Sequence, residues 1–369
     1  MTNGVAAPNV PPGTEAVHKG ERMIRAAILD DYQNVAMSLA DWSPIAKDVE
    51  IKVFNEPFAN QAEAVKALQG FAVVVGMRER TPFPRAVIEA LPDLKLLITT
   101  GAKNNSFDVK AATERGVTVC GTGGFGSPTV GIAFGLMLEL TRRVGFENAR
   151  MKKGERWQVT LGHDLEGLTL GIVGLGKLGQ RVAAVGKTFG MKVIAWSQNL
   201  TPEKAAEAGA AYASREELFA NSDIVSIHYQ LGPRSRGLIT AADLGRMKKT
   251  AYLINTARAP IVDQAALLKA LQEKKIAGAG LDVFEVEPLP VDDPYRKLDN
   301  VVITPHLGYV SLQNYKKYFP DIVEDIRAWL DGKPVRVISP YRATKASTTS
   351  PRCCTPRRRA RPRRAARCR

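Results

Sequence analysis

The chain has 369 residues, of which 45% are hydrophobic and 24% charged, a composition ordinary for a soluble globular protein. This length is enough for two domains with a hydrophobic core each. No apolar run reaches the roughly 18–20 residues of a membrane-spanning helix, and the N-terminus lacks the basic and apolar regions of a signal peptide. We therefore expect a cytoplasmic protein without a membrane partner, with a flexible leader over residues 1–22.

The formal net charge of +15 is concentrated at the end of the chain. Residues 341–369 hold 11 Lys and Arg and no acidic residue, which leaves +4 for the first 340 residues. This segment has no apolar periodicity, so we expect a disordered basic tail. It is either an arm that binds polyanions or the product of a frameshifted or misannotated end, since Arg, Pro, Ala and Cys are what GC-rich DNA encodes out of frame. The body of the chain gives no reason to expect nucleic-acid binding.

Cysteine placement agrees with a reducing compartment. Three of the four cysteines lie in the basic tail, and only Cys120 lies in the body of the chain. The folded part therefore has no disulfide framework. No Cys/His spacing suggests a metal site, and none is predicted.

Short apolar runs alternate with amphipathic stretches, a pattern typical of βαβ units and parallel sheets. In the first third of the chain, strands are expected at 24–29, 49–54, 71–76 and 94–99, and helices at 61–69 and 84–91. A glycine-rich joint at 121–126 leads to a long apolar helix at 127–143, with Ser127 as its expected N-cap and Pro128 in the first turn.

A second alternating series begins at Leu168, with strands expected at 168–174, 192–196, 223–227, 251–255, 276–281 and 301–305. A capping box from Ser214 to Glu217 predicts one helix start in this series. A last helix at 315–332 is expected to be interrupted or offset by Pro320, and an extended segment at 334–338 follows it. The prediction is an α/β protein with two domains joined at residues 121–126.

The stretch "GIVGLGKLGQ" places Gly174, Gly176 and Gly179 in the G-x-G-x-x-G spacing, after a strand and at the start of a helix. In this setting the first glycine allows a tight turn, the second lets the backbone approach a pyrophosphate, and the third lets helix and strand pack closely. The free N–H groups of the helix N-terminus then face the phosphates. A glycine turn without a ligand is the alternative, and the strand and helix on either side favour a dinucleotide site.

Polar side chains follow five of the expected strands, which is where ligands sit in open parallel sheets. These side chains are Ser197, His228, Arg258, Asp282 and His306. Because the carboxyl ends of parallel strands meet at one edge of the sheet, we expect these groups to face a common site.

Three residues form a chemically coherent set beside the predicted nucleotide site. Arg258 can bind a substrate carboxylate through paired N–H donors, and His306 can transfer a proton near neutral pH. Glu287 can orient the imidazole and favour its charged form. Taken singly, they are better explained as a surface ion pair, a loop charge and a strand-end cap. Together at neighbouring strand ends, they favour catalysis.

The chain resembles the D-isomer-specific 2-hydroxyacid dehydrogenases from about residue 23 to residue 340. Four motifs carry the resemblance in order: "GLTLGIVGLGKLGQRVA", "INTARAPIVD", "GAGLDVFEVEPLP" and "VVITPHLGY". The resemblance implies Arg258 as the substrate-binding arginine, Glu287 as the carboxylate partner and His306 as the acid/base. It also implies two Rossmann-like domains: a discontinuous substrate domain over 23–121 and 311–340, and an NAD(P)-binding domain over 122–310.

The resemblance implies further site residues and partners. Substrate binding would involve Gly101 and Ala102 besides Arg258, with backbone N–H groups of 101–103 offered to the substrate carboxylate. Apart from the resemblance, we expect Arg78 to bind substrate because the stretch "MRERTPF" at 77–83 should face the pocket. Asp282 would hold the nicotinamide carboxamide. The helix at 127–143 and the arm after it would support a homodimer. The expected cofactor-binding residues are Gly174, Gly176, Lys177, Leu178, Gly179, Ser197, Gln198, His228, Thr256 and Asp282.

The sequence departs from the family pattern in places that affect the substrate pocket. Lys103 stands where the family often has a glycine, and Ala259 follows Arg258 where glycine is usual. The predicted function is a D-2-hydroxyacid dehydrogenase or 2-keto acid reductase with an NAD(P) cofactor. The alternative is a nucleotide-sensing interaction protein of the corepressor type with little turnover. Arg78 and Arg80 could meet a second anionic group on the substrate, or they could belong to an ordinary charged loop.

The strand "VIAW" is followed directly by Ser197, where an NAD-selective site usually has Asp or Glu. A carboxylate there would accept a hydrogen bond from the ribose 2′-hydroxyl and repel a 2′-phosphate. Ser197 and Gln198 can bind either group and repel neither. No arginine follows directly, and Lys204 lies further along the chain. The prediction is use of both cofactors or a preference for NADPH.

Overall fold

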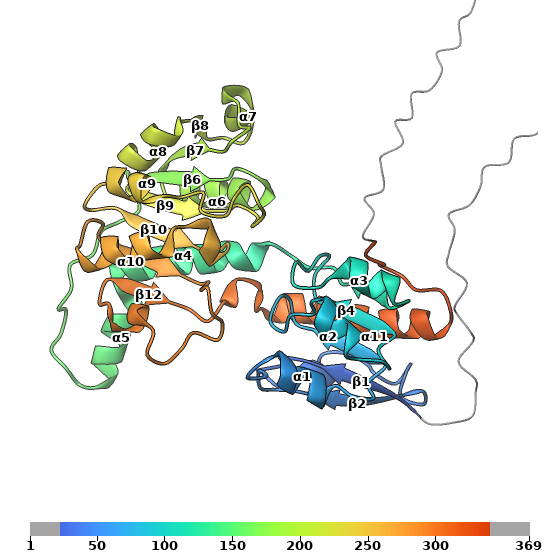
Figure 1. The fold of residues 1–369 in the computed structure, drawn as a ribbon. Helices are drawn as coiled ribbons and strands as arrows, with labels where there is room; N and C mark the ends of the chain where they lie inside the picture. Colours follow the sequence, from blue (N-terminus) through green and yellow to red (C-terminus); the bar gives the residue numbers. More distant parts are fainter. Residues whose placement is uncertain (1–22, 340–369) are drawn as a thin grey trace, which may run out of the picture.

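The structure is a computed structural model that describes residues 23–339 and contains two parallel β-sheets flanked by helices (Figure 1). The fold class predicted from the sequence is confirmed. The predicted leader at 1–22 and basic tail at 341–369 lie outside the described residues. Within residues 23–339, no helix is both long enough and apolar enough to cross a membrane.

The first sheet has five strands in the order β2-β1-β3-β4-β5. Its central strands are fully buried apolar runs, which is typical of parallel sheets covered by helices on both faces. Its strands are β1 (Ile24–Ile28), β2 (Val49–Val53), β3 (Val73–Gly76), β4 (Leu96–Thr99) and β5 (Thr118–Gly121), and its helices are α1 (Gln61–Ala67), α2 (Arg85–Glu89) and α3 (Val109–Glu114).

The last helix of the chain, α11 (Leu312–Leu330), returns to this first sheet (Figure 1). Its buried side chains, among them Phe319, Ile322 and Ile326, share a core with Val75 and Ile98 of the sheet. The helix runs continuously through Pro320, so the expected interruption there is wrong. The segment after α11 then lies beside β5, where the Ile338 amide donates to the Val119 carbonyl.

The second sheet has seven strands in the order β12-β11-β10-β9-β6-β7-β8. The strand order reverses between β6 and β9, and ligands of open α/β sheets bind at such a switch point. The strands are β6 (Thr169–Val173), β7 (Lys192–Trp196), β8 (Ala211–Tyr212), β9 (Ile224–Ile227), β10 (Tyr252–Asn255), β11 (Gly278–Leu281) and β12 (Val301–Ile303), and the helices are α6 (Lys177–Thr188), α7 (Pro202–Glu207), α8 (Arg215–Asn221), α9 (Ala241–Arg246) and α10 (Gln264–Gln272).

Helix α6 shows why this part of the sequence folds as it does. Its buried residues are Gly179, Val182, Ala183 and Gly186, spaced three or four apart, so they form one face against the sheet. The capping box that was predicted for α8 is present, with Ser214 and Glu217 each accepting from the other's backbone amide.

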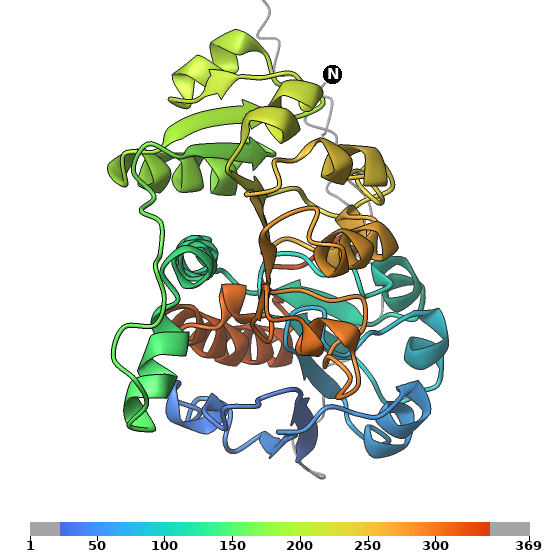
Figure 2. The same cartoon turned by 90° about the vertical axis from the view of Figure 1, so that its left-hand side faces the viewer.

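Helix α4 (Ser127–Arg142) follows the first sheet in sequence and packs against the second, where Val130, Phe134 and Met137 are buried (Figure 1). Its N-cap is Gly126, without a side-chain cap, so the prediction of Ser127 as the cap was wrong by one residue. Figure 2 shows α5 (Val144–Lys152) and the chain after it along one side of the molecule.

Each sheet with the helices packed on it forms one unit of the molecule. The chain crosses twice between the two units, at residues 122–126 and 304–311, and side chains at the starts of α11 and α4 connect these crossings. Asn314, which is 0% exposed, accepts from the Phe125 amide at 2.7 Å and donates to the Tyr309 carbonyl at 2.8 Å. Thr129 donates to the Gly308 carbonyl at 2.6 Å. The second crossing also carries His306, so the catalytic candidates lie where the two units meet.

Candidate active site

The glycine turn after β6 has the geometry that a dinucleotide site needs. Gly174 has a φ of +99°, and a Cβ on it would lie 2.9 Å from the His228 carbonyl oxygen. A Cβ on Gly179 would lie 2.2 Å from the Gly174 oxygen, so only glycine permits this contact between helix and turn. Gly176 forms the N-cap of α6 and has open space where a Cβ would lie. This open position leaves the free N–H groups of the helix accessible to a phosphate.

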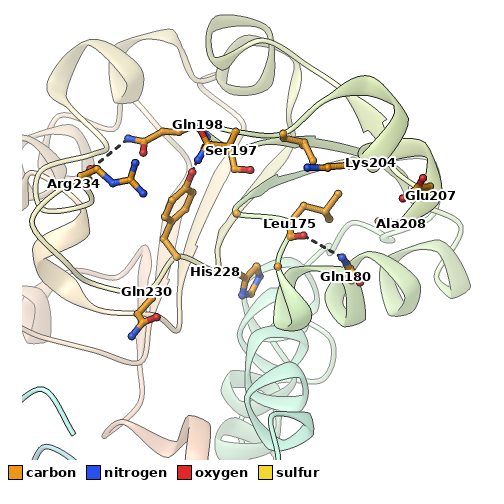
Figure 3. A pocket seen from close by; sticks show the side chains of 15 residues that line it. Leu175, Gln180, Ser197, Gln198, Lys204, Glu207, Ala208, His228, Gln230 and Arg234 are labelled. Carbon is orange, nitrogen blue, oxygen red and sulfur yellow. Dashed lines mark hydrogen bonds between the residues drawn. The ribbon is translucent and has the colours of Figure 1, made fainter. Parts of the chain in front are cut away.

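A cavity of about 760 Å³ opens beside this turn (Figure 3). Its walls come from the glycine turn, from the end of β7 with Ser197 and Gln198, and from the segment after β9 with His228. This volume falls within the range of small-molecule and cofactor sites, about 300–1,000 Å³.

Cationic and uncharged side chains surround the end of β7 in this cavity. Figure 3 shows Lys204 directed toward Ser197, with Arg234 on the other side beside Gln198. The Gln198 side chain donates to the Arg234 carbonyl at 3.4 Å, and the Gln198 backbone amide donates to the Tyr229 hydroxyl at 2.9 Å. Glu207, the acidic residue of the cavity wall, lies at the far end near Ala208. Arg234 is a residue that sequence reasoning missed, because it lies 37 residues after Ser197 in an irregular loop.

Two buried polar atoms that follow the neighbouring strands β9 and β10 lack a partner in residues 23–339. They are the His228 Nδ1 and the Thr256 Oγ1. His228 Nε2 is bonded to the Ser226 hydroxyl at 2.9 Å, and burial lowers the pKa of this histidine to about 4, so the ring is neutral at pH 7. Buried polar atoms are nearly always hydrogen-bonded, so these two atoms are suited to meet a polar ligand. Together with the glycine turn, they fit a bound dinucleotide.

His306 and Glu287 form the predicted pair. His306 Nδ1 lies 2.7 Å from Glu287 Oε2, and the other carboxylate oxygen accepts from the Phe284 amide at 2.8 Å. Burial raises the pKa of Glu287, but the hydrogen bond and charge of His306, the Phe284 amide and the Arg80 charge outweigh it and hold this pKa below its ordinary value. Glu287 is therefore ionised at neutral pH. Since Nδ1 is bonded to Glu287, the ring nitrogen available to a ligand is Nε2.

Arg80 also binds Glu287, from the other unit of the molecule. Its Nη1 lies 2.5 Å from Glu287 Oε2, and its Nε donates to the Tyr309 hydroxyl at 3.1 Å. The Arg80 side chain is only 10% exposed. Tyr309 in turn contacts the His306 ring edge to face, with centroids 5.6 Å apart. The sequence interpretation placed Arg80 at a possible anion site or in an ordinary charged loop, whereas the structure places it against the carboxylate of the proposed acid/base pair.

Asp282 organises the loop that carries His306. It is 0% exposed and accepts from the Thr304 hydroxyl at 2.6 Å and from the Leu307 and Gly308 amides at 2.7 and 2.8 Å. Burial raises its pKa, and these three hydrogen bonds act in the opposite direction. His306 adopts a left-handed backbone conformation with a φ of +54° within this turn. The side-chain contacts of Asp282 in the described residues are thus to the loop that carries His306, and its predicted role toward nicotinamide stays a prediction.

Arg258 lies at the end of β10, where Asn255 fixes the backbone around it by bonding the Ala257 amide and the Arg258 carbonyl. Its Nη2 donates to Glu79 Oε2 at 2.8 Å, and its Nη1 donates to the Ala257 carbonyl at 2.7 Å. Among the described residues, no direct hydrogen bond or ion pair joins Arg258 to His306 or Glu287. The segment 78–80 contacts both sides and connects them.

The predicted substrate residues on the first unit lie together. Arg78 donates to the Thr100 carbonyl at 3.2 Å, and its guanidinium occupies the space where a Cβ on Gly101 would lie. The Gly101 amide donates to the Thr122 hydroxyl at 2.7 Å. That amide is therefore already used, whereas the Ala102 and Lys103 amides have no hydrogen-bond partner within residues 23–339 and are the donors left in this stretch for a substrate.

Comparison with known proteins identifies the family. A family model described as "D-isomer specific 2-hydroxyacid dehydrogenase, NAD binding domain" matches residues 134–308. A glyoxylate reductase of Korarchaeum cryptofilum is 39% identical over 259 residues, which cover 68% of this chain and 78% of that protein. The chain belongs to the D-isomer-specific 2-hydroxyacid dehydrogenase family. The resemblance inferred from the four sequence motifs is thereby confirmed.

Further members of the family match over most of their length. A hydroxypyruvate reductase of Blautia hydrogenotrophica is 30% identical over 325 residues, which cover 86% of this chain and all of that protein. The crystal structure of a phosphoglycerate oxidoreductase of Vibrio cholerae is similar with a TM-score of 0.80 and 36% identity, covering 84% of this chain and all of that one. As a member of this dehydrogenase family, the protein is an oxidoreductase that acts on CH–OH donors with a nicotinamide cofactor.

Proposed function

We propose that this dehydrogenase reduces small 2-keto acids such as glyoxylate or hydroxypyruvate to D-2-hydroxy acids, and catalyses the reverse oxidation. The observation that carries the proposal is the His306–Glu287 pair, 2.7 Å apart at the junction of the two units. The names of the relatives from Korarchaeum cryptofilum and Blautia hydrogenotrophica support glyoxylate and hydroxypyruvate as substrates.

His306 acts as the general acid in the reduction. Glu287 accepts the hydrogen bond of Nδ1, so the proton that protonated His306 can transfer is the one on Nε2. This proton passes to the carbonyl oxygen of the keto acid, and the imidazole becomes neutral. The nicotinamide cofactor supplies the hydride when it is bound. In the reverse direction, neutral His306 accepts the proton of the substrate hydroxyl.

Arg258 anchors the substrate carboxylate. Its planar guanidinium can pair with a carboxylate through two parallel hydrogen bonds, which fixes the orientation of the adjacent carbonyl group. The Ala102 amide supplies a further donor from the first unit. Movement of the two units toward each other would exclude water and align the reacting groups.

The cofactor cavity supports use of NADPH. Ser197 and Gln198 stand where a carboxylate would repel a 2′-phosphate, and Lys204 and Arg234 line the same cavity. Two cations near this position attract a phosphate, while the ribose hydroxyl of NADH can still bond to Ser197. We therefore expect activity with both cofactors or a preference for NADPH.

A homodimer is proposed from the surface of α5 and the chain after it. Large apolar side chains are exposed there, including Phe146, Met151, Trp157 and Leu161. A concentration of exposed apolar groups is typical of a protein–protein interface. Light scattering coupled to gel filtration should give twice the mass of the chain, and a monomer at micromolar concentration would contradict the dimer. A cytoplasmic location belongs to the same proposal.

A panel of 2-keto acids, assayed with NADH and with NADPH, tests the proposed function. Oxidation of the cofactor on addition of glyoxylate or hydroxypyruvate is the expected result. Tight binding of the cofactor with no turnover across the panel would instead favour the nucleotide-sensing interaction protein.

A further inference from the structure

A carboxylate from the first unit already faces the arginine proposed to anchor the substrate. Glu79 follows β3, and its Oε2 lies 2.8 Å from Arg258 Nη2 and 3.8 Å from Arg78 Nε. The Glu79 side chain is 18% exposed, so solvent weakens these interactions less than it would at the surface.

The side chains around Glu79 have a net positive charge that one anionic group would balance. Three arginines line this part of the junction: Arg78, Arg80 and Arg258. Glu287 neutralises Arg80, and Glu79 lies between the other two. The three residues Arg78, Glu79 and Arg258 thus carry a net charge of about +1 at neutral pH, since carboxylates are ionised and arginines protonated there. One substrate carboxylate balances that charge.

A second anionic group of the substrate that approached Arg78 would meet the Glu79 carboxylate, because this carboxylate contacts both Arg78 and Arg258. Without Glu79, Arg78 and Arg258 would present two positive charges to a phosphate or a second carboxylate. With Glu79 in place, the same group is repelled, and like charges brought together in a partly buried site cost binding energy. The Glu79 carboxylate thus neutralises one of the two positive charges of Arg78 and Arg258 that would otherwise attract the second anionic group.

We propose that Glu79 makes the site selective for 2-keto acids with a single negative charge and excludes those that carry a phosphate or a second carboxylate. The inference rests on the proposed function, in which Arg258 binds the substrate carboxylate. It assigns Glu79 a role in substrate specificity and limits the substrate class to small monoanionic 2-keto acids.

The test compares Glu79→Gln with the wild type. Glutamine keeps the shape of the side chain and an oxygen for Arg258 while it removes the charge. The matched control is Glu50→Gln, which removes a charge from exposed β2 of the same unit. For each protein, kcat/KM is measured with glyoxylate and hydroxypyruvate, and with 3-phosphohydroxypyruvate and oxaloacetate.

The expected result is a ratio of kcat/KM for multiply charged over singly charged substrates that rises at least about tenfold in Glu79→Gln, since one full charge is removed within direct contact range of the second anionic group. The ratio should stay unchanged in Glu50→Gln. An unchanged ratio in Glu79→Gln would overturn the inference. An equal rise for both classes would also overturn it, because Glu79 would then merely compete with every substrate for Arg258.

A binding measurement separates this inference from the proposed function. Calorimetry with oxalate, a dianion, and glycolate, a monoanion, reports charge selectivity without turnover. If the wild type reduces no keto acid, the proposed function fails, while a selective gain in oxalate affinity in Glu79→Gln would still support charge exclusion. If Glu79→Gln does not fold, Glu79→Ser is measured in the same way, and equal affinity ratios in Glu79→Ser and wild type overturn the inference.

Discussion

Replacing Arg80 by methionine should raise the pKa of Glu287 and thereby change the pH dependence of the reaction. Methionine retains a long apolar side chain but removes the charge and three hydrogen bonds, at 2.5 Å to Glu287, 3.1 Å to the Tyr309 hydroxyl and 3.4 Å to the His306 carbonyl. Glu287 would keep the contacts to His306 and to the Phe284 amide. The carboxylate would then have lost one of the effects that hold its pKa low.

The size of the effect follows from the burial of the pair. Arg80 is 10% exposed and Glu287 is 20% exposed, so the bond is largely shielded from water. A hydrogen bond between charged groups in such a place contributes about 1.5–3 kcal/mol. Since about 1.4 kcal/mol corresponds to one pKa unit, the pKa of Glu287 should rise by roughly one to two units. We expect a similar loss, about 1–3 kcal/mol, in the free energy of unfolding.

The assay is a profile of kcat/KM for glyoxylate from acid to alkaline pH, with urea unfolding alongside. Glu287 must be ionised to stabilise charged His306, so a higher pKa moves the acid limb of the profile to higher pH. Arg80→Lys keeps the charge and should shift the limb less. Arg85→Met is the matched control, because Arg85 forms exposed ion pairs on α2 and its loss should leave the profile unchanged. An acid limb in Arg80→Met that coincides with the wild-type limb would refute the reasoning.

Three further predictions concern proton transfer, cofactor choice and pH-dependent stability. His306→Gln should lower kcat about 10²–10⁴-fold and leave the dissociation constant of the cofactor, measured by fluorescence titration, nearly unchanged; wild-type turnover would contradict the acid/base role. Ser197→Asp should lower kcat/KM for NADPH relative to NADH about tenfold or more, whereas strict NADH selectivity in the wild type would contradict the proposed cofactor site. Burial raises the pKa of Asp325 to about 7 despite its ion pair with Arg336, so its contribution to stability is fully present below its unfolded pKa of 3.8 and is lost as pH rises through 7. Between pH 5 and 8 the wild type should therefore lose about 2–3 kcal/mol of unfolding free energy relative to Asp325→Asn, and parallel stability curves for the two proteins would contradict this pKa.

The sequence predicted those parts of the fold that depend on local signals. Most strands lie where the apolar runs predicted them. The glycine turn at Gly174 could be identified because glycine is needed at each of its positions for a different steric reason. Strand β5 was missed because its short apolar run precedes the glycine joint directly. Helix α5 was missed because it buries no side chain, so no apolar periodicity marks it.

The contacts between the two units could not be predicted from one sequence. Arg258 and Glu79 are 179 positions apart, and Arg80 and Glu287 are 207 positions apart. No spacing rule connects charges so distant in the chain, since their meeting depends on how two sheets are placed. The pairing of His306 with Glu287 could be predicted from the sequence because both residues belong to one unit and follow neighbouring strands.

The bonded crossings between the units have a mechanical consequence. Two domains joined by a single connection can twist as well as bend about it. Here Asn314 bridges the crossings at 122–126 and 304–311, and Thr129 of α4 bonds the second one, which adds torsional stiffness. We expect these bonds to restrict any relative movement of the units to opening and closing about roughly one axis. When two units close along such a restricted path, they lose little orientational entropy. Each closure can then return Arg80 to the Glu287 carboxylate.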